Sequence, residues 1–166
     1  VEMALVLHQR GARQVVELVD RPRRQPSLYG LQQREILGQR DWDLRLAQGV
    51  RVVDRANDRT VTVVHLHGLR DPLGKGDTSA RRAQAERVAE LVLTLRAPGD
   101  VTIVAGDFNV LPDSETFAVL GTIGLVDLVR DADTRTSRYP KPTRHADYLL
   151  VSDPAVVERF EVVATP

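Results

Sequence analysis

Five consecutive residues, Val101–Ala105, constrain the fold of this chain more than any other segment. They are rich in β-branched side chains, which predicts a buried strand. Gly106 is expected to end that strand, because glycine permits a sharp change in backbone direction. Asp107 and Asn109 follow with one residue between them, so strand-like geometry would place both side chains on one face. A carboxylate and an amide at a strand end can hold Mg²⁺ or position a water beside a phosphate.

The same Gly-Asp-x-Asn segment also has a purely structural interpretation. It can form a turn that the Asp107 side chain stabilises, with no ligand involved. Pro112 then suits the first turn of a helix reaching about Leu120, with Asp113 and Glu115 near its positive end. The choice between a turn and a binding site therefore depends on the remainder of the chain.

The remainder of the chain alternates predicted strands with one long amphipathic helix. Apolar residues recur at helical spacing along Thr78–Arg96, and Pro98-Gly99 ends that helix. The helix face predicted to be buried contains Ala80, Gln84, Val88, Leu91, Val92 and Leu95. Strands are predicted at Met3–Leu7, Arg13–Val19, Trp42–Arg51, Val50–Val53, Thr60–Val64, Tyr148–Val151 and Val156–Val163. This order favours a single α/β sandwich spanning residues 1–166, with sheets inside and helices outside.

Composition excludes several classes of protein and site. The formal net charge of +0 argues against a broadly basic nucleic-acid-binding surface, and arginine carries almost all of the positive charge. Lys75 and Lys141 are the only lysines. The absence of cysteine excludes disulfides, thiolate metal sites and a cysteine nucleophile. The sequence has no signal-peptide pattern and no apolar run long enough to span a bilayer, which predicts a cytoplasmic location.

Three polar clusters each follow an apolar strand. His65 and His67 end the first of these strands, Asp107 and Asn109 end the second, and Asp147 begins a third. Open α/β sheets place their sites at strand ends, so we expect the three clusters to meet. Two histidines one residue apart can also be half of a zinc site, or simply lie solvated at the edge of the core.

Four motifs occur in an order that resembles a known superfamily. They are HLHGL, the RxxQ spacing of Arg81 and Gln84, GDFNVLPDS, and HADYLLVS. Together, over about Val61–Val163, they resemble the endonuclease/exonuclease/phosphatase superfamily, which has the fold of pancreatic deoxyribonuclease. The resemblance implies a four-layer αββα sandwich. It also implies cleavage of phosphodiesters or phosphomonoesters with Mg²⁺ or Mn²⁺.

The resemblance implies a role for each matching residue. His65 resembles the histidine that contacts the scissile phosphate, and His67 is the less favoured occupant of that role, counted here as substrate-binding. Asp107 resembles the residue that orients or deprotonates the attacking water, and Asn109 its partner on the phosphate oxygens. Asp107 and Asn109 are also the candidate metal ligands. Asp147 resembles the aspartate that orients a catalytic histidine.

Three features of the superfamily have no counterpart in this sequence. The Ser-Asp-His motif that follows the last strand is not present before Pro166, and the Asn of the first strand is missing. The metal-binding Glu usually follows Leu-Gln, whereas Glu2, Glu17 and Glu35 match by residue type only. The chain therefore resembles the C-terminal two-thirds of a superfamily member. We expect residues 1–166 alone to be catalytically inactive.

The segment before Asp147 contains further candidates for substrate binding. These are Arg138, Tyr139, Lys141 and Arg144. A loop with these side chains can grip phosphates or can simply be solvated. The sequence as a whole predicts a metal-dependent phosphodiesterase acting on a phosphoester substrate, with nucleic acid as one option. The alternatives are a phosphomonoesterase for small molecules or lipid headgroups, and a non-catalytic domain that binds an anion or a protein.

Overall fold

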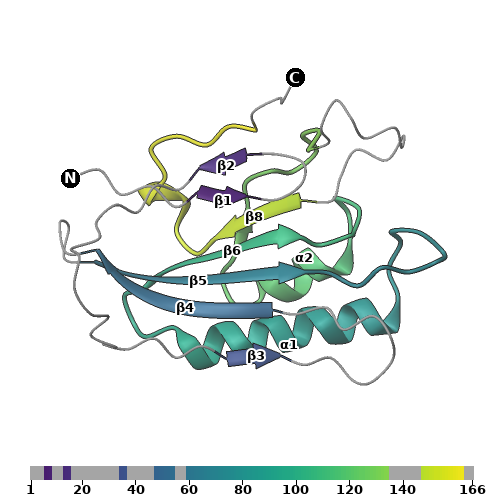
Figure 1. The fold of residues 1–166 in the computed structure, drawn as a ribbon, viewed down its shortest axis with the longest axis horizontal. Helices are drawn as coiled ribbons and strands as arrows, with labels where there is room; N and C mark the ends of the chain where they lie inside the picture. Colours follow the sequence, from purple (N-terminus) through teal and green to yellow (C-terminus); the bar gives the residue numbers. More distant parts are fainter. Residues whose placement is uncertain are drawn as a thin grey trace.

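The computed structural model describes residues 6–8, 13–15, 34–36, 47–54, 59–134 and 147–162. Its largest element is a six-stranded mixed sheet in the order β3-β4-β5-β6-β8-β7. The strands of this sheet are β3 (Arg34–Ile36), β4 (Ala47–Asp54), β5 (Arg59–His67), β6 (Val101–Asp107), β7 (Val126–Asp127) and β8 (Asp147–Val151). Two further strands, β1 (Val6–His8) and β2 (Arg13–Val15), pair antiparallel in a separate sheet. Figure 1 shows β8, β6, β5, β4 and β3 side by side.

The central strands are joined in both senses. β5 and β6 run parallel, which requires a crossover, and the helix α1 (Ser79–Leu95) supplies it. β4 pairs antiparallel with β5, and β8 pairs antiparallel with β6. Val50–Val53 and Thr60–Val64, both predicted as strands, thus lie in β4 and β5 and pair antiparallel.

Two helices cover one face of the main sheet. α1 packs against β3, β4 and β5, and it also contacts the shorter helix α2 (Glu115–Gly121) (Figure 1). Thr78 caps α1 by accepting a hydrogen bond from the Arg81 backbone N–H, as Ser114 caps α2 by accepting one from Thr116. The helices therefore mark one face of the sheet as the core face.

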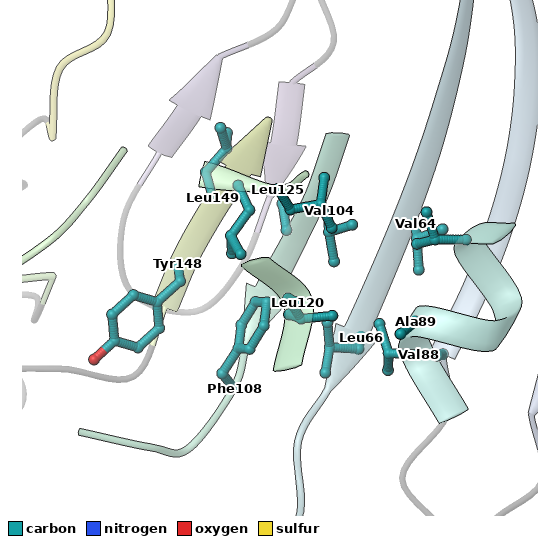
Figure 2. Packing of buried hydrophobic residues seen from close by; sticks show 14 of the residues in the cluster. Val64, Leu66, Val88, Ala89, Val104, Phe108, Leu120, Leu125, Tyr148 and Leu149 are labelled. Carbon is teal, nitrogen blue, oxygen red and sulfur yellow. The ribbon is translucent and has the colours of Figure 1, made fainter. Parts of the chain in front are cut away.

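The core lies between the helices and the even-numbered residues of the central strands. Val64 of β5, Val104 of β6 and Leu150 of β8 occupy equivalent register positions, and all three are buried. Phe108, Phe117 and Tyr148 form an aromatic cluster at one end of this core, and Figure 2 shows Phe108 beside Tyr148. The Tyr148 hydroxyl donates to the Val110 carbonyl oxygen, so its one polar atom is satisfied.

The opposite face of the central strands is also covered. Val63 of β5, Ala105 of β6 and Leu149 of β8 point away from the helices, yet they are only 5%, 0% and 6% exposed, respectively. Burial on both faces agrees with a sheet inside a layered α/β sandwich, as the sequence predicted. The α/β class is confirmed.

A partly buried ionic cluster fixes the start of β6. Asp100 accepts two hydrogen bonds from the Arg51 guanidinium (2.8 and 3.0 Å) and one from the Thr62 hydroxyl (2.8 Å). Burial alone would raise the pKa of Asp100, but these donors and the Ala97 backbone N–H lower it overall. The cluster joins β4 and β5 to the turn that follows α1.

The structure corrects several predicted boundaries. The strand of Val101–Ala105 continues through Gly106 to Asp107, because Gly106 is still paired with Leu66 and Tyr148. The helix predicted from Pro112 begins only at Glu115, since Pro112 lies in the preceding turn. No strand follows in residues 156–162, where a short 3₁₀ turn (Pro154–Val156) precedes irregular backbone.

Three further predictions concern smaller details. Trp42–Arg51 and Val50–Val53 are not separate strands within the described residues, since Ala47–Asp54 is one continuous strand. Ala80 is exposed, whereas Arg81 is buried on the helix face where apolar residues were expected. Most of Met3–Leu7 and of Arg13–Val19, where strands were also predicted, lies outside the described residues.

Candidate active site

Register places three of the predicted site residues in one row. His67 of β5 pairs with Asp107 of β6, and Asp107 pairs with Asp147 of β8. All three are odd-numbered residues, so they lie on the face opposite the helices, where side chains alternate along each strand. The row sits at the last residues of β5 and β6 and at the first residue of β8. The predicted meeting of the polar clusters at strand ends is thus observed for these three residues.

The carboxylates of Asp107 and Asp147 repel one another. Burial raises the pKa of Asp147, and the nearby Asp107 carboxylate raises it further, to about 7. Lys75 acts in the opposite direction and lowers the pKa of Asp147, which places a cation near the pair. A paired carboxylate with a raised pKa at a strand end is typical of a functional site.

The two histidines occupy different environments. The Nε2 atom of His67 lies 3.8 Å from an Asp107 carboxylate oxygen, and the His67 side chain is 48% exposed. His65 lies one repeat further into β5, in register with Ala105, and is half-buried. Burial lowers the pKa of His65, and the neighbouring His67 lowers it further. His67 is therefore the histidine beside the carboxylate pair.

The turn after β6 does not follow strand geometry. Asn109 has a left-handed backbone (φ 54°) and is 8% exposed, so it does not share a face with Asp107 as predicted. Phe108 turns into the aromatic cluster and carries the backbone out of the strand. The Asn109 side-chain amide donates to the Gly68 carbonyl oxygen (3.1 Å), and the Asn109 backbone N–H donates to the Asp107 carboxylate (2.9 Å). The Asx turn considered above is present, and it orients Asp107.

Two glycines allow the ends of β5 and β6 to approach closely. A Cβ atom at Gly106 would lie 2.0 Å from the Leu66 carbonyl oxygen, and the φ of Gly106 is +148°. A Cβ atom at Gly68 would lie 2.2 Å from the Phe108 carbonyl oxygen. Only glycine fits at either position, since a side chain would separate the two strand ends. The close approach brings His67 alongside Asp107.

A buried arginine holds the loop that follows β5, residues 68–77. Arg81 is 3% exposed, and its guanidinium donates to the carbonyl oxygens of Leu69 (3.4 Å), Gly74 (2.7 Å) and Gly76. Gln84 accepts a hydrogen bond from the Leu69 backbone N–H (3.1 Å). The RxxQ spacing on α1 therefore has a structural reason, because both side chains fix the backbone of one loop.

The far end of the same loop is fixed to α2. The Asp77 carboxylate accepts hydrogen bonds from the Ser114 hydroxyl (2.6 Å) and from the Glu115 backbone N–H (3.0 Å). Arg82 forms ion pairs with Glu86 and Glu115, both at 3.2 Å. Arg82 thus pairs with carboxylates, whereas the neighbouring Arg81 binds carbonyl oxygens.

The other predicted site residues either lie elsewhere in the sheet or fall outside the described residues. Glu35 lies in β3 at the register position of Gln48, which pairs with His65. Arg138, Tyr139, Lys141 and Arg144 lie outside the described residues, as do Glu2 and Glu17. The sequence analysis did not single out Lys75, whose charge lowers the pKa of Asp147; the one available signal was that it is one of only two lysines in an arginine-rich chain.

The described residues fit a hydrated divalent cation better than a fully protein-bound one. No group of three or more His, Asp or Glu side chains among them is arranged to hold a metal ion. Two facing carboxylates with mutual repulsion nevertheless match Mg²⁺, which binds through one or two carboxylates and keeps several waters or substrate oxygens.

In the part of the chain that the structure describes, no helix is long and apolar enough to cross a bilayer.

Solved structures share this fold at low sequence identity. D. rerio TDP2 in complex with a single-stranded DNA product matches with a TM-score of 0.53 and 15% identity, over 73% of this chain and 52% of that one. An endonuclease/exonuclease/phosphatase from Bacteroides vulgatus matches with a TM-score of 0.51 and 21% identity, over 69% of this chain and 47% of that one. The chain therefore spans about half the length of these proteins. No curated protein sequence matches it.

The sequence also matches a family model over most of its length. The model describes the endonuclease/exonuclease/phosphatase family, and the match covers residues 23–166. It includes both strand ends of the candidate site, the loop held by Arg81, and β8 with Asp147. On this match, the chain belongs to the endonuclease/exonuclease/phosphatase family.

Proposed function

We propose that this chain carries the phosphate-binding half of a phosphoester hydrolase site, and that the reaction is phosphodiester hydrolysis. The observation that supports the proposal most directly is the row of His67, Asp107 and Asp147 at the ends of three adjacent strands. Phosphoryl transfer needs an oriented nucleophile and positive charge near the phosphoryl oxygens. The row offers a carboxylate for the first and an exposed imidazole for the second.

In this proposal Asp107 orients the attacking water. Its carboxylate accepts a hydrogen bond from the Asn109 backbone N–H. Because this bond restricts rotation of the carboxylate, the turn sets the direction of the second oxygen. Its side chain is 28% exposed, so a water can reach it. A carboxylate held in this way can accept a proton from a water within hydrogen-bond distance.

We assign the phosphate contact to His67 rather than to His65. His67 adjoins Asp107 and is exposed, whereas His65 is half-buried one repeat away. A His67 ring N–H can donate to a phosphate oxygen placed above the carboxylates. Asn109, by contrast, has a structural part in this proposal. Its side-chain amide donates to the Gly68 carbonyl oxygen and its backbone N–H donates to the Asp107 carboxylate, so it joins the two turns.

Asp147 and Asp107 are the groups that would hold Mg²⁺ or Mn²⁺. When bound, such an ion supplies charge neutralisation at the phosphoryl oxygens. The protein's own contribution is to place two carboxylates at one strand end, where a bound cation would offset their mutual repulsion.

Hydrolysis and binding should be measured together on the purified chain. We expect no hydrolysis of a nitrophenyl phosphodiester, plasmid DNA or RNA by residues 1–166 alone, and Mg²⁺-dependent hydrolysis by a protein that also supplies the Glu and Ser-Asp-His motifs of the family. In that protein, Asp107→Asn should lower the rate by at least about 10²-fold. The matched control is Asp153→Asn, which removes a carboxylate that caps a surface 3₁₀ turn. Equal rates for that protein and its Asp107→Asn variant, with unchanged circular dichroism, would end the assignment.

A second candidate is an anion-binding domain without turnover. It is favoured by the lack of a three-residue metal cluster within the described ranges. In that case inorganic phosphate should bind to the wild-type chain, and its binding should weaken in His67→Gln, while no substrate is hydrolysed. Phosphomonoesters belong in the same substrate panel, because preferential release of phosphate from them would favour a phosphatase.

A further inference from the structure

Gly68 is bonded directly to the turn that carries Asp107. The Gly68 backbone N–H donates to the Asp107 carbonyl oxygen, and the Gly68 carbonyl oxygen accepts a hydrogen bond from the Asn109 side-chain amide (3.1 Å). A Cβ atom at Gly68 would lie only 2.2 Å from the Phe108 carbonyl oxygen, so the two backbones are already in contact. Because close-packed segments transmit displacement, a shift of Gly68 would also shift the turn.

The next residue, Leu69, is held from the helix α1 instead. Its backbone N–H donates to the Gln84 side-chain oxygen (3.1 Å), and its carbonyl oxygen accepts a hydrogen bond from the Arg81 guanidinium (3.4 Å). Arg81 also holds the carbonyl oxygens of Gly74 and Gly76, so its removal would loosen the whole loop of residues 68–77. Gln84 is therefore the more selective probe of the start of this loop.

A small cavity lies where α1 meets the turn after β6. Gln84 and Arg81 line it from the helix, and Phe108 lines it from the turn. The volume of the cavity is about 10 Å³, close to the minimum that accepts one water molecule. The packing therefore leaves the turn little freedom to move relative to the helix.

The same turn sets the direction of the Asp107 carboxylate. The Asn109 backbone N–H donates to that carboxylate at 2.9 Å, from a left-handed conformation (φ 54°). Residues other than glycine adopt this conformation rarely, so the bonds that hold Asn109 are needed to maintain it. One of them is the side-chain bond to Gly68, which follows from the position of the 68–77 loop. An uninterrupted series of bonds thus leads from α1 to the candidate site.

We propose that Gln84 is a positioning residue of the candidate site, which sets the direction of the Asp107 carboxylate through the backbone of Leu69. This inference rests on the proposed function, in which Asp107 orients the attacking water and, with Asp147, holds a divalent cation. It deepens that function by assigning part of the accuracy of the site to a side chain on the opposite face of the sheet. Groups that orient metal ligands in this way contribute to affinity without touching the metal.

The test compares Gln84 variants with a variant that weakens the same helix elsewhere. Gln84→Leu removes the acceptor for the Leu69 N–H, whereas Gln84→Glu retains a side-chain oxygen at the same length. Val88→Ala is the matched control, because Val88 is 2% exposed, lies one turn further along α1 and lines the same cavity. Its side chain cannot form a hydrogen bond. Gln84→Met, which also lacks a strong acceptor, replaces Gln84→Leu if that variant does not fold.

Two properties are measured on the purified chain. Amide hydrogen exchange at Gly68 and Asn109, compared with the free energy of unfolding of each variant, reports how firmly the turn is held. Titration with Mn²⁺, followed by the broadening of the amide NMR signals beside Asp107, reports the affinity of the site for a divalent cation. Thermal unfolding of each variant verifies that the fold is retained.

We expect Gln84→Leu to speed exchange at Gly68 and Asn109 and to raise the dissociation constant for Mn²⁺ by about tenfold. Gln84→Glu should restore both properties, and Val88→Ala should bind Mn²⁺ as the wild type does. Unchanged Mn²⁺ affinity in Gln84→Leu would overturn the positioning role and leave the proposed function in place. Equal weakening by Gln84→Leu and Val88→Ala would also overturn it, by showing a general effect of stability. A wild-type chain that binds no Mn²⁺ beside Asp107 would overturn both this inference and the cation site of the proposed function.

Discussion

Asp107 and Asp147 are register partners on adjacent antiparallel strands, so two carboxylates share one position at the end of the sheet. Neither residue is close to the other in sequence, and β6 and β8 are separated by α2 and β7. The pairing has an electrostatic consequence, because burial and then Asp107 raise the pKa of Asp147 to about 7. The candidate site is thus also a place where the fold stores unfavourable charge.

The raised pKa of Asp147 predicts a pH-dependent effect of Asp147→Asn on stability. The folded chain retains the Asp147 proton to higher pH than the unfolded chain, so stability from this group is present at low pH. It is lost as the pH rises from about 4, the unfolded value, through about 7. The unfolding free energy of Asp147→Asn, compared with that of the wild type, should therefore be more favourable at pH 8 than at pH 5, by on the order of 2 kcal/mol.

Urea unfolding at several pH values, with a chelator present, measures this difference. Asp107→Asn should show the same trend with a smaller amplitude, because it removes only the second of the two causes. If the difference in unfolding free energy between wild type and Asp147→Asn is constant from pH 5 to pH 8, the raised pKa of Asp147 is contradicted.

The two histidines should respond differently to substitution. His67→Gln should weaken phosphate binding by about tenfold, because His67 is the exposed ring beside Asp107. His65→Gln should affect binding less and stability more, because His65 is half-buried and its pKa is lowered first by burial. Phosphate titration and thermal unfolding of both variants measure the two effects. A greater loss of phosphate binding in His65→Gln than in His67→Gln would instead assign the phosphate contact to His65.

The neighbouring arginines of α1 should differ in the same way. Arg81→Ala should destabilise the chain by about 2–4 kcal/mol, because it leaves carbonyl oxygens of the 68–77 loop without donors. It should also speed hydrogen exchange in that loop. Arg82→Ala should leave loop exchange unchanged, since its ion pairs are on the surface. Equal exchange rates in the two variants would mean that the Arg81 contacts do not order the loop.

Gly106→Ala tests the close approach of the strand ends. A methyl group there would collide with the Leu66 carbonyl oxygen, which is backbone and cannot rotate away. We expect a loss of more than about 3 kcal/mol of unfolding free energy. The control is Gly121→Ala in α2, where nothing lies within 4 Å of the added carbon. That variant should gain about 0.5–1 kcal/mol from its lower backbone entropy in the unfolded chain. A much smaller loss of unfolding free energy in Gly106→Ala would contradict the close approach of the two strand ends.

The sequence by itself determined the elements that depend on local patterning. The apolar run before Asp107 predicted β6, and helical spacing along Thr78–Arg96 predicted α1 almost to the residue. The motifs around Asp107 and Asp147 predicted the family, which the family model confirms. These features could be found because each is encoded within a short stretch of chain, by periodicity or by a few consecutive side chains.

Only the tertiary structure decided how those stretches meet. Register between β5, β6 and β8 brought His67, rather than His65, beside the carboxylates, and a sequence does not specify pairing between distant strands. The burial of Arg81 could not be predicted either, because an arginine is normally on the surface. Its cost is offset by carbonyl oxygens from a loop that becomes adjacent only after folding. His67, Asp107 and Asp147 were candidates from the sequence, but their grouping depends on long-range contacts that only the folded chain makes.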